Sequence, residues 1–382
     1  MKDLRSALTQ AREQHLYRRR RVLDSPQQPH LVVEGRSLLS FCSNDYLGLA
    51  SDPRVAQALC KGVAHWGSGS GSAHLVSGHS RAHHALEEAL ADFTGRERVL
   101  LFSSGYLANL AVITSLCGRK DTVVQDKLNH ASLIDGARLS GAELKRYAHN
   151  DMAAARKRLT TARGECLLAV DGVFSMDGDL AELPALAALC REHGAWLMVD
   201  DAHGLGVLGK AGGGSLDHFG LDPDQVPVLM GTLGKAFGTA GAFVAGSADL
   251  IETLIQKARS YIFTTALPAA LAEATLASLG ILREEAWRRG HLEVLVARFR
   301  QGAKQLGFEL SPSGTPIQPL IAGRSETALA WSQALESQGI LVTAIRPPTV
   351  PEGSARLRIT FSAAHQEQDV DRLLAALEDL AP

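Results

Sequence analysis

The sequence is poor in aromatic residues and has no marked excess of either charge. Phe, Trp and Tyr make up 5% of the 382 residues, and the formal net charge is −2. Nucleic-acid binding usually needs a basic face, often with aromatic side chains for stacking, and binding to an anionic membrane also needs a basic face. No apolar run approaches the ~20 residues that span a bilayer. We therefore expect no nucleic acid and no membrane as a partner.

Cysteine is also scarce, and the five cysteines are widely separated. They are Cys42, Cys60, Cys117, Cys166 and Cys190. Because the number is odd and no CxxC pair occurs, the pattern indicates neither a disulfide framework nor a cysteine-based zinc site, and no bound metal is expected. Reduced thiols predict a cytoplasmic location. No apolar run adjoins the four arginines at 18–21, so this basic stretch is not predicted to be a signal peptide.

The remaining composition is that of a globular protein, with 46% hydrophobic and 21% charged residues. The length fits one large domain and one smaller domain. A helix is predicted over 3–22, a hairpin over 31–42 and an amphipathic helix over 80–93 that Ser80 caps and Gly95 ends. The expected parts are an N-terminal helix and hairpin arm (1–45), a large domain (46–270) and a smaller α+β C-terminal domain (271–382).

Short apolar runs alternate with helix-like segments through the middle of the chain. The runs are Val99–Phe102, Thr122–Gln125, Cys166–Val170, Trp196–Val199, Val226–Met230 and Ala242–Ala245. This alternation predicts an α/β fold with a mostly parallel sheet that helices cover on both faces. In such sheets ligands bind at the carboxyl ends of the strands, so polar residues just after these runs are the candidates for a site.

Two glycine-rich segments invite other interpretations. Gly204–Gly209 matches GxGxxG after a strand, but residues 210–214 contain three glycines and are not expected to begin a helix. A dinucleotide site needs that helix, so this function is disfavoured. Residues 67–72 alternate Gly and Ser, which predicts a turn whose backbone N–H groups can approach an anion.

Five groups of polar residues follow the predicted strands. They are Ser103–Asn109, His130, Ser175, Asp200–His203 and Thr232–Lys235. Taken alone, an aspartate after a strand is usually a turn former, a histidine is usually structural and a lysine is usually a surface charge. Their common position at strand ends indicates a shared site instead.

Pyridoxal phosphate (PLP) requires this combination of residues. Its aldehyde forms a Schiff base with a lysine amine, and its pyridine nitrogen needs a carboxylate to stay protonated. Its phosphate suits a helix N-terminus. The predicted contacts are Lys235 to the aldehyde, Asp200 to the ring nitrogen, His203 to the phenolic oxygen, His130 stacked on the ring, and Gly105, Tyr106, Ser175 and Thr232 as further contacts.

The motifs resemble those of the α-oxoamine synthase family of fold-type I PLP-dependent enzymes. The resemblance runs from Ser43–Leu49 to Arg356–Arg358 and includes the segments 129–132, 171–178, 200–204 and 232–235. It implies a seven-stranded sheet in the large domain and a homodimer with its active site at the interface. Members of the family condense an amino acid with an acyl thioester and release CO2.

Two segments bear on the substrate. Thr343–Pro351 and His74–Gly78 resemble the members that use L-alanine and a pimeloyl thioester in biotin biosynthesis. The donor is pimeloyl-CoA or pimeloyl-acyl carrier protein, and the sequence leaves this choice open. The alternative enzyme within the family is glycine C-acetyltransferase. A second alternative is a non-catalytic partner subunit, but such subunits lack the lysine that this chain has at position 235.

The resemblance also implies roles for individual residues. Lys235, His130 and Asp200 would be catalytic, and Thr264 and Thr265 would reach the phosphate of the neighbouring subunit's PLP. The implied substrate contacts are Arg18, Asn44, His130, Thr349 and Arg358, of which Arg358 and Asn44 would hold the amino-acid carboxylate. At the N-terminus the choice between Arg18, Tyr17 and Arg19 stays open.

Overall fold

The computed structural model describes residues 3–381, which form two compact units. The large unit consists of Leu49–Ser175 and Leu180–Arg289. The small unit consists of the described residues up to Gly48, the short segment Met176–Asp179 and the described residues from Gly290 on.

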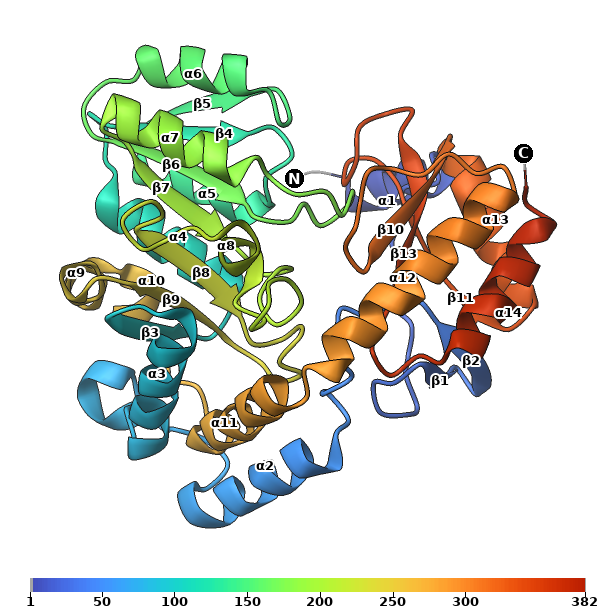
Figure 1. Cartoon of the computed structure of the whole chain (residues 1–382), viewed down its shortest axis with the longest axis horizontal. Coiled ribbons are helices and arrows are strands. Elements are labelled where there is room, and N and C mark those ends of the chain that lie inside the picture. Colours follow the sequence, from blue (N-terminus) through green and yellow to red (C-terminus); the bar gives the residue numbers. More distant parts are fainter. Residues whose placement is uncertain (1–2, 382) are drawn as a thin grey trace. The chain divides into compact units, whose positions relative to one another are not determined.

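A seven-stranded sheet, counted over the described residues, forms the centre of the large unit (Figure 1). In sheet order its strands are β3 (Arg98–Phe102), β9 (Ala242–Gly246), β8 (Val228–Thr232), β7 (Trp196–Asp200), β6 (Cys166–Asp171), β4 (Thr122–Asp126) and β5 (Glu143–Tyr147). Strand β9 is antiparallel to β3 and β8, and the other neighbouring strands are parallel. The predicted α/β class with a mostly parallel sheet is confirmed.

Strand β5 is the one strand of this sheet that the apolar pattern did not predict. Its sequence, Glu-Leu-Lys-Arg-Tyr, carries three charged residues, and most of its side chains are partly or fully exposed. It lies at the edge of the sheet beside β4. Charged side chains are typical of edge strands because they discourage pairing with another chain.

Helices cover both faces of the sheet (Figure 1). One face packs against α4 (Gly105–Leu116), α5 (Ala131–Ser140), α9 (Ala248–Lys257) and α10 (Arg259–Ile262). The helices α6 (Met152–Thr160), α7 (Leu183–His193) and α8 (Gly214–Phe219) belong to the other face. Apolar residues from β3, β4, β6, β7, β8 and β9 form one continuous core with the first group, which fixes the strand ends where the site forms.

A further group of helices completes the large unit. Helix α11 (Ala269–Glu284) lies along α2 (Pro53–Trp66) and contacts α3 (Arg81–Thr94). A Cβ atom on Gly62 would stand 2.8 Å from the Ala270 Cα, so glycine permits the close approach of α2 and α11. As predicted, Ser80 caps α3 and Gly95 ends it with a φ of 64°. A short π-helix, η1 (His74–Gly78), precedes α3.

The GxGxxG segment forms turns and not the start of a helix. Helix α8 begins only at Gly214. A Cβ atom on Gly204 would lie 2.1 Å from the Asp201 Oδ1 atom. The glycine is therefore required by the buried Asp201 carboxylate, and the dinucleotide interpretation finds no support.

The small unit contains two three-stranded sheets within the described residues. Their strands are β1 (His30–Val33), β2 (Arg36–Ser40) and β11 (Ile340–Leu341), and β10 (Ile317–Gly323), β13 (Ala355–Thr360) and β12 (Thr343–Ile345). The C-terminal helices are α12 (Trp287–Gln305), which belongs to this unit from Gly290 on, α13 (Ser325–Ser337) and α14 (Glu367–Glu378). The predicted hairpin is confirmed and turns at Glu34 and Gly35, both with positive φ. Strand β11 runs parallel to β2, with Ile340 opposite Leu39.

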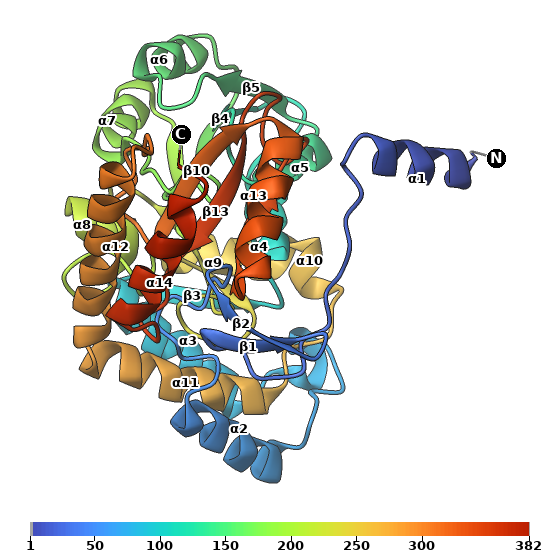
Figure 2. The ribbon, with the colours of Figure 1, turned by 90° about the vertical axis from the view of Figure 1, so that its right-hand side faces the viewer.

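The N-terminal helix is shorter than predicted. Helix α1 spans Leu4–Glu13, and His15 follows with a φ of 56°, so the basic stretch at 18–21 is not helical. Arg19 and Arg21 instead pair with Glu34 at the hairpin turn. Repulsion between consecutive arginines in a helix and attraction to Glu34 both favour the extended course. Figure 2 shows α1 at the end of this extended segment.

The unit boundaries and the expected domain segments differ at two places. The expected small domain begins at residue 271, in the first turn of α11. The structure instead packs α11 with α2 and α3 in the large unit. The expected N-terminal arm belongs to the same compact unit as the C-terminal residues.

None of the helices within residues 3–381 has both the length and the apolar character needed to cross a bilayer.

Candidate active site

A cavity of about 200 Å³ lies at the carboxyl ends of the parallel strands in the large unit. Its lining includes the predicted residues Gly105, Tyr106, His130, Ser175, Asp200, His203, Thr232 and Lys235. Thr264 and Thr265 are not among the described residues that line it. They follow α10, where Thr264 is half-buried and Thr265 is exposed.

Lys235 lies in a tight turn directly after β8. The Gly238 N–H donates to the Lys235 carbonyl oxygen at 2.8 Å and closes the turn. Gly238 has a φ of 64°, and a Cβ atom there would stand 2.4 Å from the Ala50 nitrogen. The turn directs the Lys235 Nζ atom to 2.9 Å from the His203 Nε2 atom. A lysine amine is thus held next to an imidazole inside the cavity.

Asp200 ends β7 and is almost completely buried. Its Oδ2 atom accepts a hydrogen bond from the Asn109 Nδ2 atom at 2.7 Å, and its Oδ1 atom accepts from the Ala202 N–H at 3.1 Å. Two donors in fixed positions orient this carboxylate toward the cavity.

Asp171 stands opposite Asp200 on the neighbouring strand β6. Burial, and then the Asp200 carboxylate, raise the pKa of Asp171 well above its usual range. Its Oδ2 atom accepts from the His130 N–H at 3.0 Å, and its Oδ1 atom has no hydrogen-bond partner within residues 3–381. A buried polar atom without a partner at the wall of a cavity indicates room for a polar ligand.

His130 is the N-cap residue of α5, and its ring is exposed to the cavity. The Ser132 Oγ atom lies 2.7 Å from the His130 Nδ1 atom and accepts from the Asn109 Nδ2 atom at 2.8 Å. The Ser132 backbone N–H donates to His130 Nδ1 at 3.3 Å, so Nδ1 is an acceptor and the Ser132 hydroxyl also donates to it. The ring therefore presents its Nε2 side to other partners.

Three lining or supporting residues lie in segments that the sequence motifs singled out, but no individual role was predicted for them. Asn109 and Asp171 line the cavity, and Ser132 joins Asn109 to His130. Asn109 stands four residues after Gly105 on α4, and this spacing puts both on one helix face. That spacing was the available signal, whereas the pairing of Asp171 with Asp200 depends on the sheet order.

The N-terminus of α4 adds an anion-binding element. Ser104 caps the helix by accepting from the Leu107 N–H at 3.3 Å, and Gly105 begins it. First-turn N–H groups of a helix lack intrahelical partners and bind phosphate well. Together, an amine, a buried carboxylate, two imidazoles and a helix N-terminus fit the chemical groups of PLP.

The substrate residues predicted in the small unit form two groups. The Arg358 Nη1 atom donates to the Asn44 Oδ1 atom at 3.1 Å, and the Tyr46 hydroxyl donates to the same oxygen at 3.3 Å. Arg356, on the same face of β13, instead forms an ion pair with Asp177. The two arginines of this strand therefore have different surroundings.

The second group joins the N-terminal segment to the loop after β12. The Arg18 Nη2 atom donates to the Thr349 Oγ1 atom at 3.3 Å, and both residues are exposed. Arg19 pairs with Glu34, and the Tyr17 ring lies under the Arg12 guanidinium. Of the three alternatives, Arg18 is the one placed beside Thr349.

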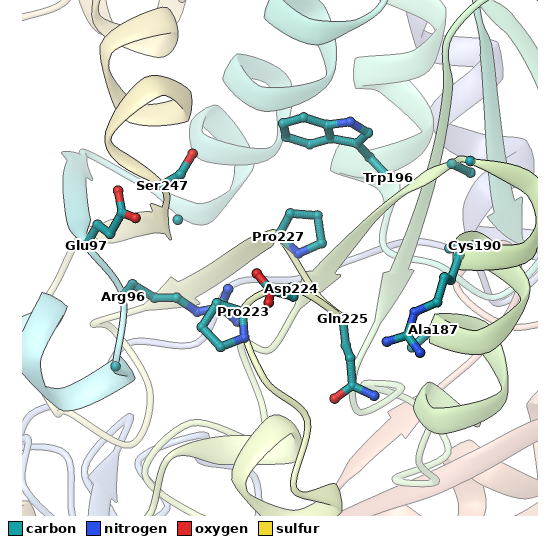
Figure 3. Close-up of a pocket in the computed structure, with 15 residues that line it drawn as sticks. Arg96, Glu97, Ala187, Cys190, Trp196, Pro223, Asp224, Gln225, Pro227 and Ser247 are labelled. Carbon is teal, nitrogen blue, oxygen red and sulfur yellow. The ribbon is translucent and has the colours of Figure 1, made fainter.

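A larger cavity, of about 530 Å³, lies at the other end of the parallel strands, where their amino ends are (Figure 3). Arg96, Glu97, Trp196, Pro227 and Ser247 are among its lining residues, which come from the starts of β3, β7 and β8 and from the end of β9. The lining contains none of the predicted site residues. Its volume is larger, but the chemistry typical of a site is gathered at the carboxyl ends.

The sequence matches a family model over most of its length. The model for aminotransferase class I and II matches residues 36–377. The chain belongs to this family.

Curated relatives share more than 60% of their residues with this chain. An 8-amino-7-oxononanoate synthase of Stutzerimonas stutzeri is 63% identical over 377 residues, which cover 99% of this chain and 96% of the relative. One of Pseudomonas putida (strain W619) is 62% identical over 380 residues, which cover 100% of this chain and 97% of the relative. These names favour the family members that use L-alanine and a pimeloyl thioester over glycine C-acetyltransferase.

Solved structures share the fold. A Sphingomonas wittichii serine palmitoyltransferase superimposes with a TM-score of 0.93 at 32% identity and covers 99% of this chain and 96% of its own. An 8-amino-7-oxononanoate synthase from Francisella tularensis has a TM-score of 0.79 at 31% identity, with 90% of this chain and 97% of that chain covered. A further neighbour, also with a TM-score of 0.93, is a structure of SPT with PLP.

Proposed function

We propose that the protein is a PLP-dependent acyltransferase that condenses L-alanine with a pimeloyl thioester. The products are 8-amino-7-oxononanoate, CO2 and a free thiol, in the synthesis of biotin. The observation that carries the proposal is the cavity in which Lys235, Asp200, His130 and His203 converge. The names of relatives more than 60% identical over the whole chain support the choice of substrates.

PLP would supply a protonated ring that accepts electrons from the alanine Cα when bound. We assign the attachment of the cofactor and the removal of the Cα proton to the Lys235 amine. The His203 imidazole, 2.9 Å from that amine, orients it. Asp200 would hold the ring nitrogen in its protonated form, and Asn109 and Ala202 hold its carboxylate in place.

The other assigned residues bind and orient the reactants. Gly105, Tyr106, Ser175 and Thr232 would contact the cofactor, and the N-terminus of α4 would bind its phosphate. His130 would pack against the ring and supply a hydrogen bond to the alanine carboxylate or the acyl carbonyl. Arg358 and Asn44 bind the carboxylate, and Arg18 and Thr349 contact the acyl donor. In the reaction the Cα bonds to the thioester carbonyl carbon, and the C–S bond breaks to release a thiolate that takes up a proton. The carboxylate then leaves as CO2, and a proton takes its place on Cα.

The proposed assembly is a homodimer. Val76 and Phe263 are apolar yet 80% and 70% exposed, and they belong to η1 and to the residue after α10, two neighbouring elements. Burial of such side chains against a second copy is favourable, and Thr264 and Thr265 adjoin Phe263. Phe263→Asp should shift the sedimentation coefficient to that of a monomer and weaken PLP retention. Leu139→Asp, at an exposed apolar position on α5, is the control and should leave both unchanged.

The proposed compartment is the cytoplasm, in agreement with five free cysteines. For the acyl carrier, CoA and acyl carrier protein remain the two proposed donors.

The test is a spectrum followed by an activity assay. Purified protein with PLP should show a visible band that borohydride bleaches, and it should release thiol from pimeloyl-CoA with L-alanine and not with glycine. Lys235→Ala should lose the bleachable band and the turnover. Lys210→Ala, an exposed lysine that also follows a glycine, should keep both. Turnover of Lys235→Ala near the wild-type rate would contradict the assignment, and turnover with glycine and acetyl-CoA would change the substrates.

A further inference from the structure

A cluster of histidines lies outside the cavity described above, between η1 and the first two turns of α3. It consists of His74, His79, His83, His84 and Glu87. Four of these, without His83, line a separate cavity of about 440 Å³ together with Tyr261. The proposed reaction uses none of them.

The geometry of one subset suits a metal ion. One ligand atom each from His79, His84 and Glu87 can be chosen so that the three lie within 4.8 Å of one another. The corners of an equilateral triangle with that edge lie about 2.8 Å from its centre, and zinc needs about 2.0–2.1 Å to nitrogen and about 2.0–2.2 Å to carboxylate oxygen. Small side-chain rotations therefore suffice, and two of the side chains, His79 and His84, are exposed enough to make them.

The surroundings favour this subset. The His79 Nδ1 atom lies 3.1 Å from the His74 Nδ1 atom, which leaves His79 Nε2 toward Glu87, whose Oε2 atom is 3.9 Å away. The second Glu87 oxygen, Oε1, accepts from the Leu101 N–H at 3.2 Å. Each of these two side chains thus has one polar atom fixed by a neighbour, and the two remaining atoms, His79 Nε2 and Glu87 Oε2, lie 3.9 Å apart. A histidine ligand held through its second ring nitrogen is the usual arrangement at metal sites.

The other subset consists of His74, His79 and His83, and its His83 is already engaged in hydrogen bonds. The His83 Nδ1 atom accepts from the Ser80 N–H at 3.0 Å as part of the cap of α3. The His83 Nε2 atom lies 2.6 Å from the Leu267 carbonyl oxygen, to which it donates. With both ring nitrogens engaged, His83 has a structural role, and His74 is the support of His79.

We propose that His79, His84 and Glu87 bind a divalent transition-metal ion such as Zn²⁺, with His74 orienting His79. Two imidazoles and one carboxylate are a ligand set that Zn²⁺ takes in proteins, and a fourth position remains for water. The cysteine pattern predicted no bound metal. The histidines offer a different ligand set, because the turn at His79 brings them together. A bound ion would join that turn to α3.

Direct binding measurements test the proposal without using enzyme activity. PLP-bound protein is first treated with EDTA and dialysed, and Zn²⁺ is then titrated in by calorimetry, with the stoichiometry checked by equilibrium dialysis. We expect one Zn²⁺ per chain, which EDTA removes. His84→Ala and Glu87→Gln should each weaken binding by more than about 100-fold, and His74→Phe, which removes a supporting contact, by about 10- to 100-fold.

His218→Ala, an exposed histidine on α8, is the matched control and should bind Zn²⁺ as the wild type does. The visible band of bound PLP reports that each variant is folded. If Glu87→Gln fails to fold, His84→Ala still tests the ligand set, because it alters only an exposed side chain. Less than one Zn²⁺ per chain in the wild type would overturn the proposal. Unchanged affinity in His84→Ala would overturn the ligand set, even if His74→Phe bound more weakly.

Discussion

Asn109 offers the most direct test of how the site is held together. It is completely buried, and its Nδ2 group donates to both Asp200 and Ser132. Leucine has a similar size but no donor, so Asn109→Leu removes both hydrogen bonds at once. A hydrogen bond to a charged acceptor contributes about 1.5–3 kcal/mol, which corresponds to a factor of roughly 10 to 150 in rate or binding.

The expected result is a fall in kcat/KM for L-alanine within that range. Asp200 keeps only its hydrogen bond from the Ala202 N–H, so its carboxylate is less firmly directed at the ring nitrogen of PLP. Because Lys235 is untouched, the cofactor should still attach. The assay is thiol release at saturating pimeloyl-CoA, combined with a pH titration of the visible band of bound PLP, which should shift when Asp200 moves.

Thr114→Val is the matched control on the same helix. The Thr114 hydroxyl donates only to the Leu110 carbonyl oxygen of α4, so its loss affects the helix and not the cavity. If Asn109→Leu kept the wild-type kcat/KM and the wild-type band, the link from Asn109 to Asp200 would have no catalytic importance. An equal loss in Thr114→Val would mean that the effect comes from α4 as a whole.

Three further predictions concern the substrate, the pH and the packing. Arg358→Lys should raise the KM for L-alanine at least about tenfold with a smaller change in kcat, because an ammonium cannot bind a carboxylate through two parallel hydrogen bonds; an unchanged KM would remove Arg358 from the substrate site. Burial raises the pKa of Asp201 to about 7, so the folded state retains a proton that the unfolded state has already lost above about pH 4. Unfolding stability should therefore fall as the pH rises from about 4 to about 7, by at most about 1.4 kcal/mol per pH unit, and chemical denaturation of Asp201→Asn should show a flatter profile. Gly204→Ala should lower stability by about 1–3 kcal/mol through its clash with Asp201, whereas Gly280→Ala on α11, where nothing lies within 4 Å, should not; equal melting temperatures for the two would refute the packing argument.

The sequence was most informative where burial is simplest. Each of the six apolar runs became a strand of the large sheet, because a strand covered on both faces must be apolar throughout. Strand β5 was missed because an edge strand need not follow that rule. Helix α1 was overextended because ion pairs with Glu34, distant in sequence, determine the course of the arginines.

The site could be predicted in part for a similar reason. Asp200 ends β7 and Lys235 lies shortly after β8, and the end of a strand is visible in the sequence. The contacts among Asn109, Ser132 and Asp171 depend on which strands and helices are neighbours, and the apolar pattern does not contain that order. The histidine cluster was missed because it depends on the turn between η1 and α3.

The parallel pairing of β2 with β11 has a consequence for how the chain folds during synthesis. Leu39 pairs with Ile340, so about 300 residues separate the two strands. At ribosomal rates of about 5–20 residues per second, β11 emerges about 15–60 s after β2. For that time β2 lacks its second partner, and a two-stranded hairpin alone is marginally stable. The small unit can therefore complete its first sheet only after the whole large unit has been synthesised, which makes the hairpin a natural contact for chaperones on the nascent chain.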